Sequence, residues 1–435
     1  MNADEIIELS RKHTLFEWGA QSAANPLAVA RAKGVYFWTA DGRRYIDFNS
    51  QLMCVNIGHG DERVVRAIQE QASTLAYVTP AMATEPRARL GRKLAEIAPG
   101  DIDVFFFTNG GTEANENAIK IARWVTGRHK ILARYRSYHG ATAASITLTG
   151  EPRRWPAEPG IPGVVHVLDP YHGIERGWDT AEAALEQLEE VIALEGSQTI
   201  AAFILETVTG TNGILVPPDG YLEGVRDLCT RHGILMIADE VMAGFGRTGE
   251  WFAVNHWGVV PDLITMAKGL TSAYVPLGAV GMRRAVAQYF SSRPFASGLT
   301  YGSHPVACAA ALATIKVYED DRLLDNARVM GRLMADLLSD LALRHPSVGA
   351  TRSLGLFGAV ELVRDRQRRE PLAPFNSTSP EMTALAAFLR ERGLYTIVRW
   401  NTFFTNPPLS INEGEMREAF AILDEGLEIT DKAVR

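Results

Sequence analysis

Residues 234–270 read ILMIADEVMAGFGRTGEWFAVNHWGVVPDLITMAKGL. Two short apolar runs in this stretch each lead into a charged residue: residues 234–238 precede Asp239, and residues 263–267 precede Lys268. Short apolar runs of this kind are typical of buried parallel strands. Because ligands of open α/β sheets bind at the carboxyl ends of the strands, the stretch predicts an α/β fold with an acid and an amine at the ligand-binding edge.

Asp239 and Lys268 together suit imine chemistry. A lysine in an apolar cleft loses part of its preference for the charged form and becomes a nucleophile that can form a Schiff base. A nearby carboxylate suits a protonated pyridine nitrogen. The alternative is that Asp239 caps a helix and Lys268 is a solvated strand end, but both interrupt strongly apolar surroundings. We therefore expect a functional pair.

The residues from Asp239 onward read Asp-Glu-Val-Met-Ala-Gly-Phe-Gly-Arg-Thr-Gly, and Lys268 stands directly before Gly-Leu. This stretch resembles the cofactor core of the class III (omega) aminotransferases. The resemblance implies a fold-type-I pyridoxal-phosphate transferase, with a large domain around a mostly parallel, seven-stranded sheet and a small α+β domain from both chain ends. It also implies that Lys268 holds pyridoxal 5'-phosphate as an imine and moves a proton, while Asp239 keeps the pyridine nitrogen protonated.

Composition agrees with a globular enzyme. The chain has 435 residues, 46% of them hydrophobic and 22% charged, which is enough for a large core and more than one domain. A net charge of −7 argues against a nucleic-acid partner, and no apolar run approaches the roughly 20 residues of a membrane span. Cys54, Cys229 and Cys308 are too scattered for a disulfide framework or a metal site, and the acidic N-terminus lacks a signal sequence. We expect a cytoplasmic protein.

The order of motifs along the chain predicts the domain organisation. Asp41 and Gly42 separate two β-rich segments and form a strong hairpin signal. Beyond this hairpin, apolar strands alternate with helical patterns, which predicts a mostly parallel sheet. The expected strands are 104–107, 130–133, 164–167, 200–205, 234–238 and 263–267, with helices at 113–125 and 181–194. The expected domains are 1–60 and 321–435 for the two parts of the small domain, and 61–320 for the large cofactor-binding domain.

A glycine-containing turn lies between the expected strand at 104–107 and the helix after it. Backbone amides at a helix N-terminus bind phosphate, and glycine lets the anion approach closely. Gly110, Gly111 and Thr112 could form such a cup, although a plain strand-to-helix turn would account equally well for these residues. The family resemblance implies that the phosphate cup lies here.

Two further segments carry candidate contacts to the cofactor ring. Tyr138 follows another expected strand, and a tyrosine ring can lie flat against an aromatic cofactor; a core tyrosine is the alternative. The resemblance implies that Tyr138 and the adjacent His139 contact the cofactor. It also implies that Val241, two residues after Asp239, presses on the opposite face of the ring.

The substrate pocket has four candidate residues. Leu52 and Met53 lie in a hydrophobic strip that lines the pocket in the resembled family, although two core residues would give the same pattern. Glu206 ends the strand at 200–205, where this chain has Glu-Thr-Val instead of the family's Glu-Pro-Val. Many relatives place a carboxylate-binding arginine near the C-terminus, and Arg399 stands about two residues closer to the following prolines than the family pattern implies. A guanidinium pairs well with a carboxylate or sulfonate, whereas a surface arginine is the alternative.

Residues 298–304 resemble a segment that crosses a dimer interface in the family. The resemblance implies that Thr300 contacts the cofactor phosphate of the partner subunit. We therefore expect a homodimer, or a dimer of dimers, with shared active sites.

A competing motif occurs at residues 244–249, which read Gly-Phe-Gly-Arg-Thr-Gly and match the dinucleotide pattern G-x-G-x-x-G. A dinucleotide site needs a small-residue helix immediately after the glycines, but bulky residues follow here. A nicotinamide-dependent dehydrogenase is therefore a distant alternative. A non-enzymatic binding module would explain neither Asp239 nor Lys268.

The sequence predicts a transaminase. The pattern lacks the glutamine that many ornithine- and 4-aminobutyrate-type relatives carry where Met242 stands. We therefore expect an omega-amino acid or amine as donor (β-alanine, taurine or a simple amine) and a keto acid, pyruvate, as acceptor. The alternatives within the fold are a 2-oxoglutarate-dependent aminotransferase, an aminomutase and a decarboxylase.

Overall fold

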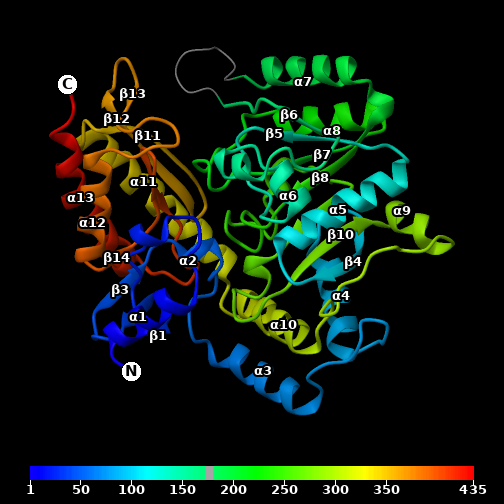
Figure 1. Cartoon of the computed structure of the whole chain (residues 1–435), viewed down its shortest axis with the longest axis horizontal. Coiled ribbons are helices and arrows are strands. Elements are labelled where there is room, and N and C mark those ends of the chain that lie inside the picture. The colour runs from blue at the N-terminus through cyan, green and yellow to red at the C-terminus, as the bar shows by residue number, and fades with distance from the viewer. Residues whose placement is uncertain (172–179) are drawn as a thin grey trace.

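A central sheet of seven strands organises the large part of the molecule. The computed structural model describes residues 1–171 and 180–435 (Figure 1). The strand order is β4-β10-β9-β8-β7-β5-β6, and β10 runs antiparallel to both of its neighbours in an otherwise parallel sheet. The predicted α/β fold is confirmed. The strands are β4 (Ile102–Thr108), β5 (Lys130–Arg134), β6 (Val164–Val167), β7 (Ile200–Glu206), β8 (Leu235–Asp239), β9 (Leu263–Met266) and β10 (Gly278–Arg283).

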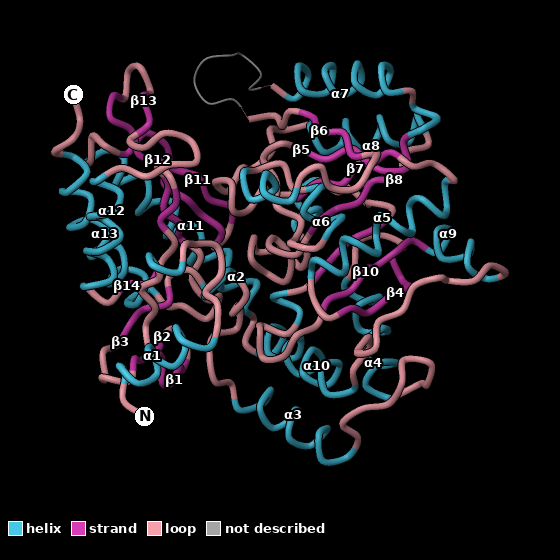
Figure 2. Tube along the Cα trace, viewed as in Figure 1, coloured by secondary structure: helices cyan, strands magenta, loops and turns pink. Residues whose placement is uncertain are grey.

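Helices cover both faces of this sheet (Figure 2). Neighbouring strand residues alternate between the faces: Ile131 packs with α5, whereas Leu132 packs with α7 and α8. Burial on both faces explains why the strands appear in the sequence as nearly continuous apolar runs. The helices of this region are α5 (Gly111–Thr126), α6 (Ala143–Leu148), α7 (Ala181–Glu195), α8 (Tyr221–His232) and the short α9 (Arg284–Ala287).

Three helices form a separate layer at the lower edge of the molecule in Figure 1. The helices α3 (Glu62–Thr74) and α4 (Glu85–Ile97) both pack against α10 (Pro305–Asp320). Buried side chains of α4 and α10, such as Leu94 and Ile315, join the main hydrophobic core. Among the described helices, none is both long and apolar enough to span a membrane.

The two ends of the chain share one small sheet. The strand β14 (Leu394–Tyr395) pairs in parallel with β3 (Arg44–Asp47), and both termini lie on the same side of the molecule in Figure 1. This pairing supports a small domain built from both chain ends, and the division at residues 60 and 320 stays a prediction. The same sheet contains β1 (Val29–Lys33) and β2 (Tyr36–Thr39), and α1 (Ala3–His13) precedes it.

A second small sheet lies in the C-terminal part of the chain. Its strands follow the order β11-β12-β16-β15, and β13 pairs with β12. The helix α11 packs on β11, and α12 packs on α13. The elements are α11 (Leu323–Arg344), β11 (Val348–Leu354), β12 (Phe357–Asp365), β13 (Glu370–Pro371), α12 (Pro380–Glu391), β15 (Val398–Arg399), β16 (Thr402–Thr405) and α13 (Glu413–Asp431).

Candidate active site

The carboxyl ends of three neighbouring strands bring the candidate catalytic residues together. Glu206 ends β7 and lies opposite Asp239 at the end of β8, which in turn lies opposite Thr265 of β9. Lys268 follows β9 and begins the short 3₁₀ helix η5 (Lys268–Leu270). Its φ of 43° is left-handed, a strained conformation for a residue with a side chain. This conformation turns the backbone sharply at the residue whose side chain enters the cavity.

A cavity of about 440 Å³ lies at this edge of the sheet. Most of the predicted cofactor contacts line it. They are Gly110, Gly111, Thr112, Tyr138, His139, Asp239, Val241 and Lys268, together with Glu206 from the predicted substrate set.

Asp239 is held by three donors. Its Oδ2 accepts hydrogen bonds from His139 Nδ1 at 2.8 Å and from Asn115 Nδ2 at 2.8 Å, and its Oδ1 accepts one from the backbone N–H of Val241 at 3.0 Å. An ionised carboxylate only accepts hydrogen bonds, so His139 carries its proton on Nδ1. This arrangement fixes the carboxylate in place and leaves lone pairs for a cationic ring nitrogen.

Asn115 was not among the predicted site residues. Its side-chain oxygen accepts a hydrogen bond from Thr265 Oγ1 at 2.7 Å, which orients its amide nitrogen toward Asp239. Asn115 lies on α5 and is only 1% exposed. A polar residue inside the apolar pattern of the helix was the available signal, since buried polar groups need partners.

The N-terminus of α5 forms a cradle that fits a phosphate. The N-cap residue Gly110 supplies no side-chain cap to the first backbone N–H groups. The hydroxyls of Thr112 and Thr142 lie 2.8 Å apart beside this end of the helix. A Cβ on Gly111 would lie 2.8 Å from Val241 Cγ1, and one on Gly140 would lie 2.3 Å from Thr112 Oγ1. The cradle therefore keeps its shape only with glycine at these positions.

Burial changes the charge preference of two groups at the strand ends. It lowers the pKa of Lys268, an effect that Cys54, Asp239 and Glu206 partly oppose. Burial also raises the pKa of Glu206. The Glu206 carboxylate accepts hydrogen bonds from the backbone N–H groups of Tyr138 at 2.9 Å and Gly210 at 2.8 Å. Glu206 thus anchors the loop that carries Tyr138.

A second cavity of about 520 Å³ adjoins the first, since Tyr138 and Lys268 line both. Three of the predicted substrate residues line it: Leu52 and Met53 from α2 (Ser50–Met53), and Arg399. Leu52 is 41% exposed and Met53 only 2% exposed. Further lining residues that the sequence did not single out are Trp18, Arg153, Thr211, Trp400 and Phe404.

Two arginines in this second cavity share one carboxylate. Glu151 accepts a hydrogen bond from Arg153 Nε on one oxygen and from Arg399 Nη2 on the other. Arg153 places its guanidinium carbon 3.7 Å from the centre of the Tyr138 ring. Arg399 is therefore a cavity residue and not a surface residue. The sequence could not pair it with Arg153, because Arg399 lies on β15 and Arg153 in a 3₁₀ helix (Pro152–Ala157) far away in the chain.

Thr300 lies apart from both cavities in this single chain. It is exposed, and its carbonyl oxygen accepts a hydrogen bond from Tyr77 Oη at 2.7 Å. Its predicted contact involves a second subunit, so that contact stays a prediction.

The glycine motif at 244–249 has a structural role. Arg247, at its centre, is fully buried and donates to the carbonyl oxygens of Leu356 at 3.0 Å and Pro407 at 2.5 Å. It also donates to Ser50 Oγ and Asn56 Oδ1, each at 3.0 Å. Through these bonds Arg247 links the segment that contains Ser50 and Asn56 to the C-terminal part of the chain.

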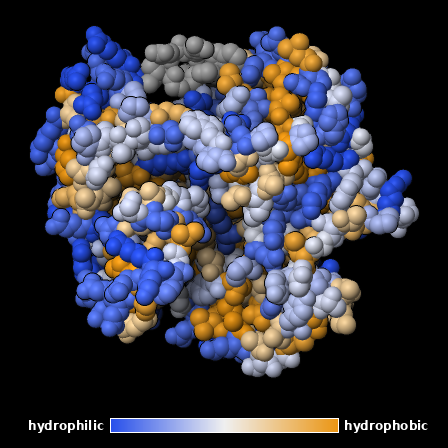
Figure 3. All heavy atoms as spheres, viewed as in Figure 1, coloured by the Kyte–Doolittle hydropathy of each residue, from blue (hydrophilic) through white to orange (hydrophobic). Residues whose placement is uncertain are grey.

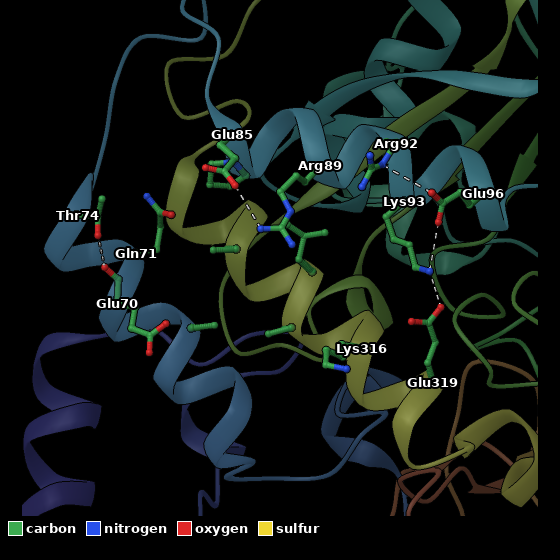
Figure 4. A pocket seen from close by; sticks show the side chains of 15 residues that line it. Glu70, Gln71, Thr74, Glu85, Arg89, Arg92, Lys93, Glu96, Lys316 and Glu319 are labelled. Atoms are coloured by element: carbon green, nitrogen blue, oxygen red, sulfur yellow. Dashed lines mark hydrogen bonds and ion pairs between the residues drawn. The ribbon is translucent and has the colours of Figure 1, made fainter.

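Another cavity, of about 610 Å³, lies between α3, α4 and α10 (Figure 4). Its charged side chains pair with one another, as in Glu85 with Arg89 at 3.3 Å and Lys93 with Glu96 at 3.4 Å. It contains none of the predicted site residues. We therefore assign the chemistry to the two adjoining cavities at the sheet edge.

The model of the family "Aminotransferase class-III" matches residues 19–427. The chain belongs to the class III aminotransferases. It is 36% identical to the taurine–pyruvate aminotransferase of Rhodobacter capsulatus, covering 86% of this chain and 85% of that protein. It is 34% identical to the putrescine–pyruvate aminotransferase of Pseudomonas aeruginosa, covering 93% and 91%. The crystal structure of taurine:2-oxoglutarate aminotransferase from Bifidobacterium kashiwanohense superposes with a TM-score of 0.96 at 39% identity and covers 99% of both chains.

This class III aminotransferase uses pyridoxal phosphate. The residues at the sheet edge fit the cofactor: the α5 cradle suits its phosphate, the carboxylate of Asp239 suits its ring nitrogen, and Lys268 stands in the same cavity. The relatives differ in both amino donor and keto acid. Family membership therefore establishes the reaction type and leaves the substrates to be argued from the second cavity.

Proposed function

We propose that this aminotransferase takes its amino group from an omega-amino acid with an anionic end, such as taurine or β-alanine, and passes it to pyruvate. The observation that carries the proposal is the guanidinium of Arg153, which lies 3.7 Å from the Tyr138 ring centre in a cavity shared with Lys268. A planar guanidinium pairs well with a sulfonate or carboxylate. An amino acid whose acid group lies two carbons from its nitrogen suits a site in which cation and lysine line one cavity.

The geometry at the sheet edge supports a role for each of the proposed catalytic residues. Pyridoxal phosphate, when bound, supplies an electron sink for the carbanion on the substrate carbon. Asp239 holds positive charge at the ring nitrogen. Lys268 has a lowered pKa because of its burial, so its amine can take a proton from the substrate carbon and return it. Tyr138 and Val241, which line the same cavity, would confine the ring between them.

Pyruvate is the proposed acceptor because Met242 stands where many ornithine- and 4-aminobutyrate-type relatives carry glutamine. Met242 is buried beside the cofactor cavity. A second candidate is 2-oxoglutarate. The relative from Bifidobacterium kashiwanohense is named for that acceptor, which supports this second candidate.

A homodimer is part of the same proposal. Two large hydrophobic side chains stand exposed beside Thr300, with Tyr77 at 40% and Tyr301 at 60%. Tyr77 and Tyr301 contact each other with ring centroids 6.1 Å apart. Figure 3 shows hydrophobic atoms gathered at the lower edge of the molecule, where α3 and α10 lie in Figure 1. Exposed apolar patches of this kind mark protein interfaces, which supports a partner subunit at Thr300.

The test presents donors and acceptors separately to the holoenzyme and follows the cofactor absorbance. Taurine and β-alanine should aminate the cofactor, and pyruvate should reverse the change. Arg153→Ala should raise the KM for taurine at least tenfold and leave the KM for putrescine nearly unchanged, since putrescine lacks the anion. Arg154→Ala is the matched control, because Arg154 pairs with Glu158 at 2.6 Å outside the cavity. Strict dependence on 2-oxoglutarate would overturn the choice of acceptor, and equal KM changes for both donors would remove Arg153 from substrate binding.

A further inference from the structure

Glu151 is the buried member of the charged cluster in the second cavity. Its side chain has no exposed surface, whereas those of Arg153 and Arg399 are 23% and 20% exposed. Gly150 explains how the carboxylate reaches this place, since a Cβ there would lie 2.2 Å from the carbonyl oxygen of Tyr135. The backbone at position 150 can pack against the backbone of Tyr135 only because the residue is glycine. This close packing places the Glu151 carboxylate where both arginines can donate to it.

The cluster joins the two halves of the molecule. Glu151, Arg153 and Thr211 belong to the part around the large sheet, whereas Arg399 belongs to β15. Both arginines also bind Thr211: Arg153 Nη2 donates to its Oγ1 at 3.0 Å, and Arg399 Nη1 donates to its carbonyl oxygen at 3.2 Å. Glu151 and Thr211 thus occupy one donor edge of each guanidinium.

Charge in this cluster is only partly balanced. Two guanidiniums and one carboxylate leave a net charge of +1 facing the cavity. Burial lowers the pKa of Arg399, Glu151 opposes that effect and Arg153 adds to it. The carboxylate between the two guanidiniums is what allows two cations to lie together in a half-buried place.

We propose that Glu151 is a specificity-determining residue: it acts as a built-in counter-ion that lets the Arg153–Arg399 pair accept one negative charge from a substrate and disfavours a second. This inference rests on the proposed function. It names the substrate class more sharply, as donors and acceptors with a single anionic end group. A dianion in the same cavity meets repulsion from the Glu151 carboxylate that a monoanion largely avoids.

The experiment measures inhibition of the holoenzyme by two unreactive anions, propane-1-sulfonate with one charge and glutarate with two. In Glu151→Gln the net charge becomes +2. The ratio of the glutarate constant to the propanesulfonate constant should fall about tenfold relative to the parent enzyme, since one more ion pair of about 1.4 kcal/mol becomes available to the dianion. Glu151→Asp keeps the charge and should keep the ratio of the parent. An unchanged ratio in Glu151→Gln would overturn the proposal.

A double variant separates charge from shape. Glu151→Gln combined with Arg399→Gln restores a net charge of +1 and removes the unpaired buried guanidinium, so it also covers the case in which Glu151→Gln alone does not fold. Its inhibition ratio should return to that of the parent. If the ratio stays at the Glu151→Gln value, or if both constants rise together, Glu151 acts only by holding the cluster in shape.

The outcome is independent of the proposed donor. Inhibition can be measured with any amine that the holoenzyme accepts. Failure of the parent enzyme to turn over taurine and β-alanine would overturn the proposed function, whereas a charge-insensitive inhibition ratio in an active enzyme would overturn the role of Glu151 alone.

Discussion

At the residue scale, the site depends on a few side chains whose surroundings set their charge. Asp239 receives hydrogen bonds from His139, Asn115 and the Val241 backbone, and Lys268 has a lowered pKa because it is buried. The hydrogen bonds therefore fix the carboxylate in place, and the amine becomes easier to deprotonate. One cavity thus contains both a carboxylate that can accept a hydrogen bond from the cofactor ring and an amine that can act as a nucleophile and base.

Lys268→Ala should lower the turnover number by several orders of magnitude, because the lysine amine both attaches the cofactor and transfers the proton. Borohydride reduction of the holoenzyme should bleach its visible absorbance and leave a stable label on Lys268, detectable by mass spectrometry of peptides. Label on another lysine would contradict the assignment.

Asp239→Asn should still bind the cofactor and react slowly, and full activity in that variant would rule out the pairing with the ring nitrogen.

Glu240, next to Asp239, makes stability depend on pH. Burial raises its pKa from 4.5 to about 7, while hydrogen bonds from Thr207, Ala253 and Val254 act in the opposite direction. The folded state thus retains a proton that the unfolded state releases. The stabilising contribution is complete below pH 4.5 and is lost as the pH rises through about 7.

The free energy of unfolding, measured with urea at pH 5 and pH 8, should therefore fall by roughly 1–3 kcal/mol more in the parent than in Glu240→Gln. The variant supplies the reference for every other titrating group. Identical pH dependence in the two proteins would show that Glu240 is not the group responsible.

At the element scale, the start of α5 determines whether the cofactor phosphate can be held. Gly111→Ala places a Cβ at 2.8 Å from Val241 Cγ1, which forces α5 and the Asp239–Val241 segment apart. Cofactor affinity should fall at least tenfold, as measured by absorbance titration of the apoenzyme with pyridoxal phosphate. Gly91→Ala is the control, since a Cβ there meets nothing within 4 Å. Equal affinities in both variants would remove the cradle from cofactor binding.

Elements were predictable where the chain itself carries the signal. The parallel strands are apolar on both faces and were found at their predicted positions, as with β7 (Ile200–Glu206). The strand β10 (Gly278–Arg283) was missed because it contains two glycines and no long apolar run. Gly281 is needed there, because a Cβ would lie 2.8 Å from Ile264 Cγ2.

The same reasoning applies to the site. Lys268 and Asp239 could be predicted, because each comes directly after an apolar run of the sequence. Arg153 and Glu151 could not, because their role arises only when β15 brings Arg399 beside them. Periodicity and local motifs carry no information about contacts between segments that are far apart in the sequence.

At the scale of the whole molecule, Arg247 ties distant segments together. Its guanidinium serves two carbonyl oxygens and two side chains, and burial lowers its pKa to about 10. Arg247→Met keeps the volume and removes every donor. The free energy of unfolding should fall by about 3–5 kcal/mol, because buried acceptors lose their partners. A loss below about 1 kcal/mol in urea titration would contradict this role.

The proposed homodimer can be tested by subunit mixing. Light scattering should give twice the chain mass of 47.7 kDa. Thr300→Ala should weaken cofactor binding. When its subunits are mixed with those of Lys268→Ala, each mixed dimer should regain one complete site, since one subunit supplies Lys268 and the other Thr300. No recovery on mixing would show that Thr300 acts within its own subunit or not at all.

The parallel pairing of Leu394 with Ile46 and of Tyr395 with Asp47 has a consequence for biosynthesis. When the N-terminal hairpin leaves the ribosome, the strand that completes its sheet has not yet been made. One edge of β3 therefore stays unpaired until residues 394 and 395 have been synthesised. An exposed strand edge is a template for mispairing. A message cut short before codon 394 would yield a chain in which this edge is never paired, which is a substrate for chaperones and proteases.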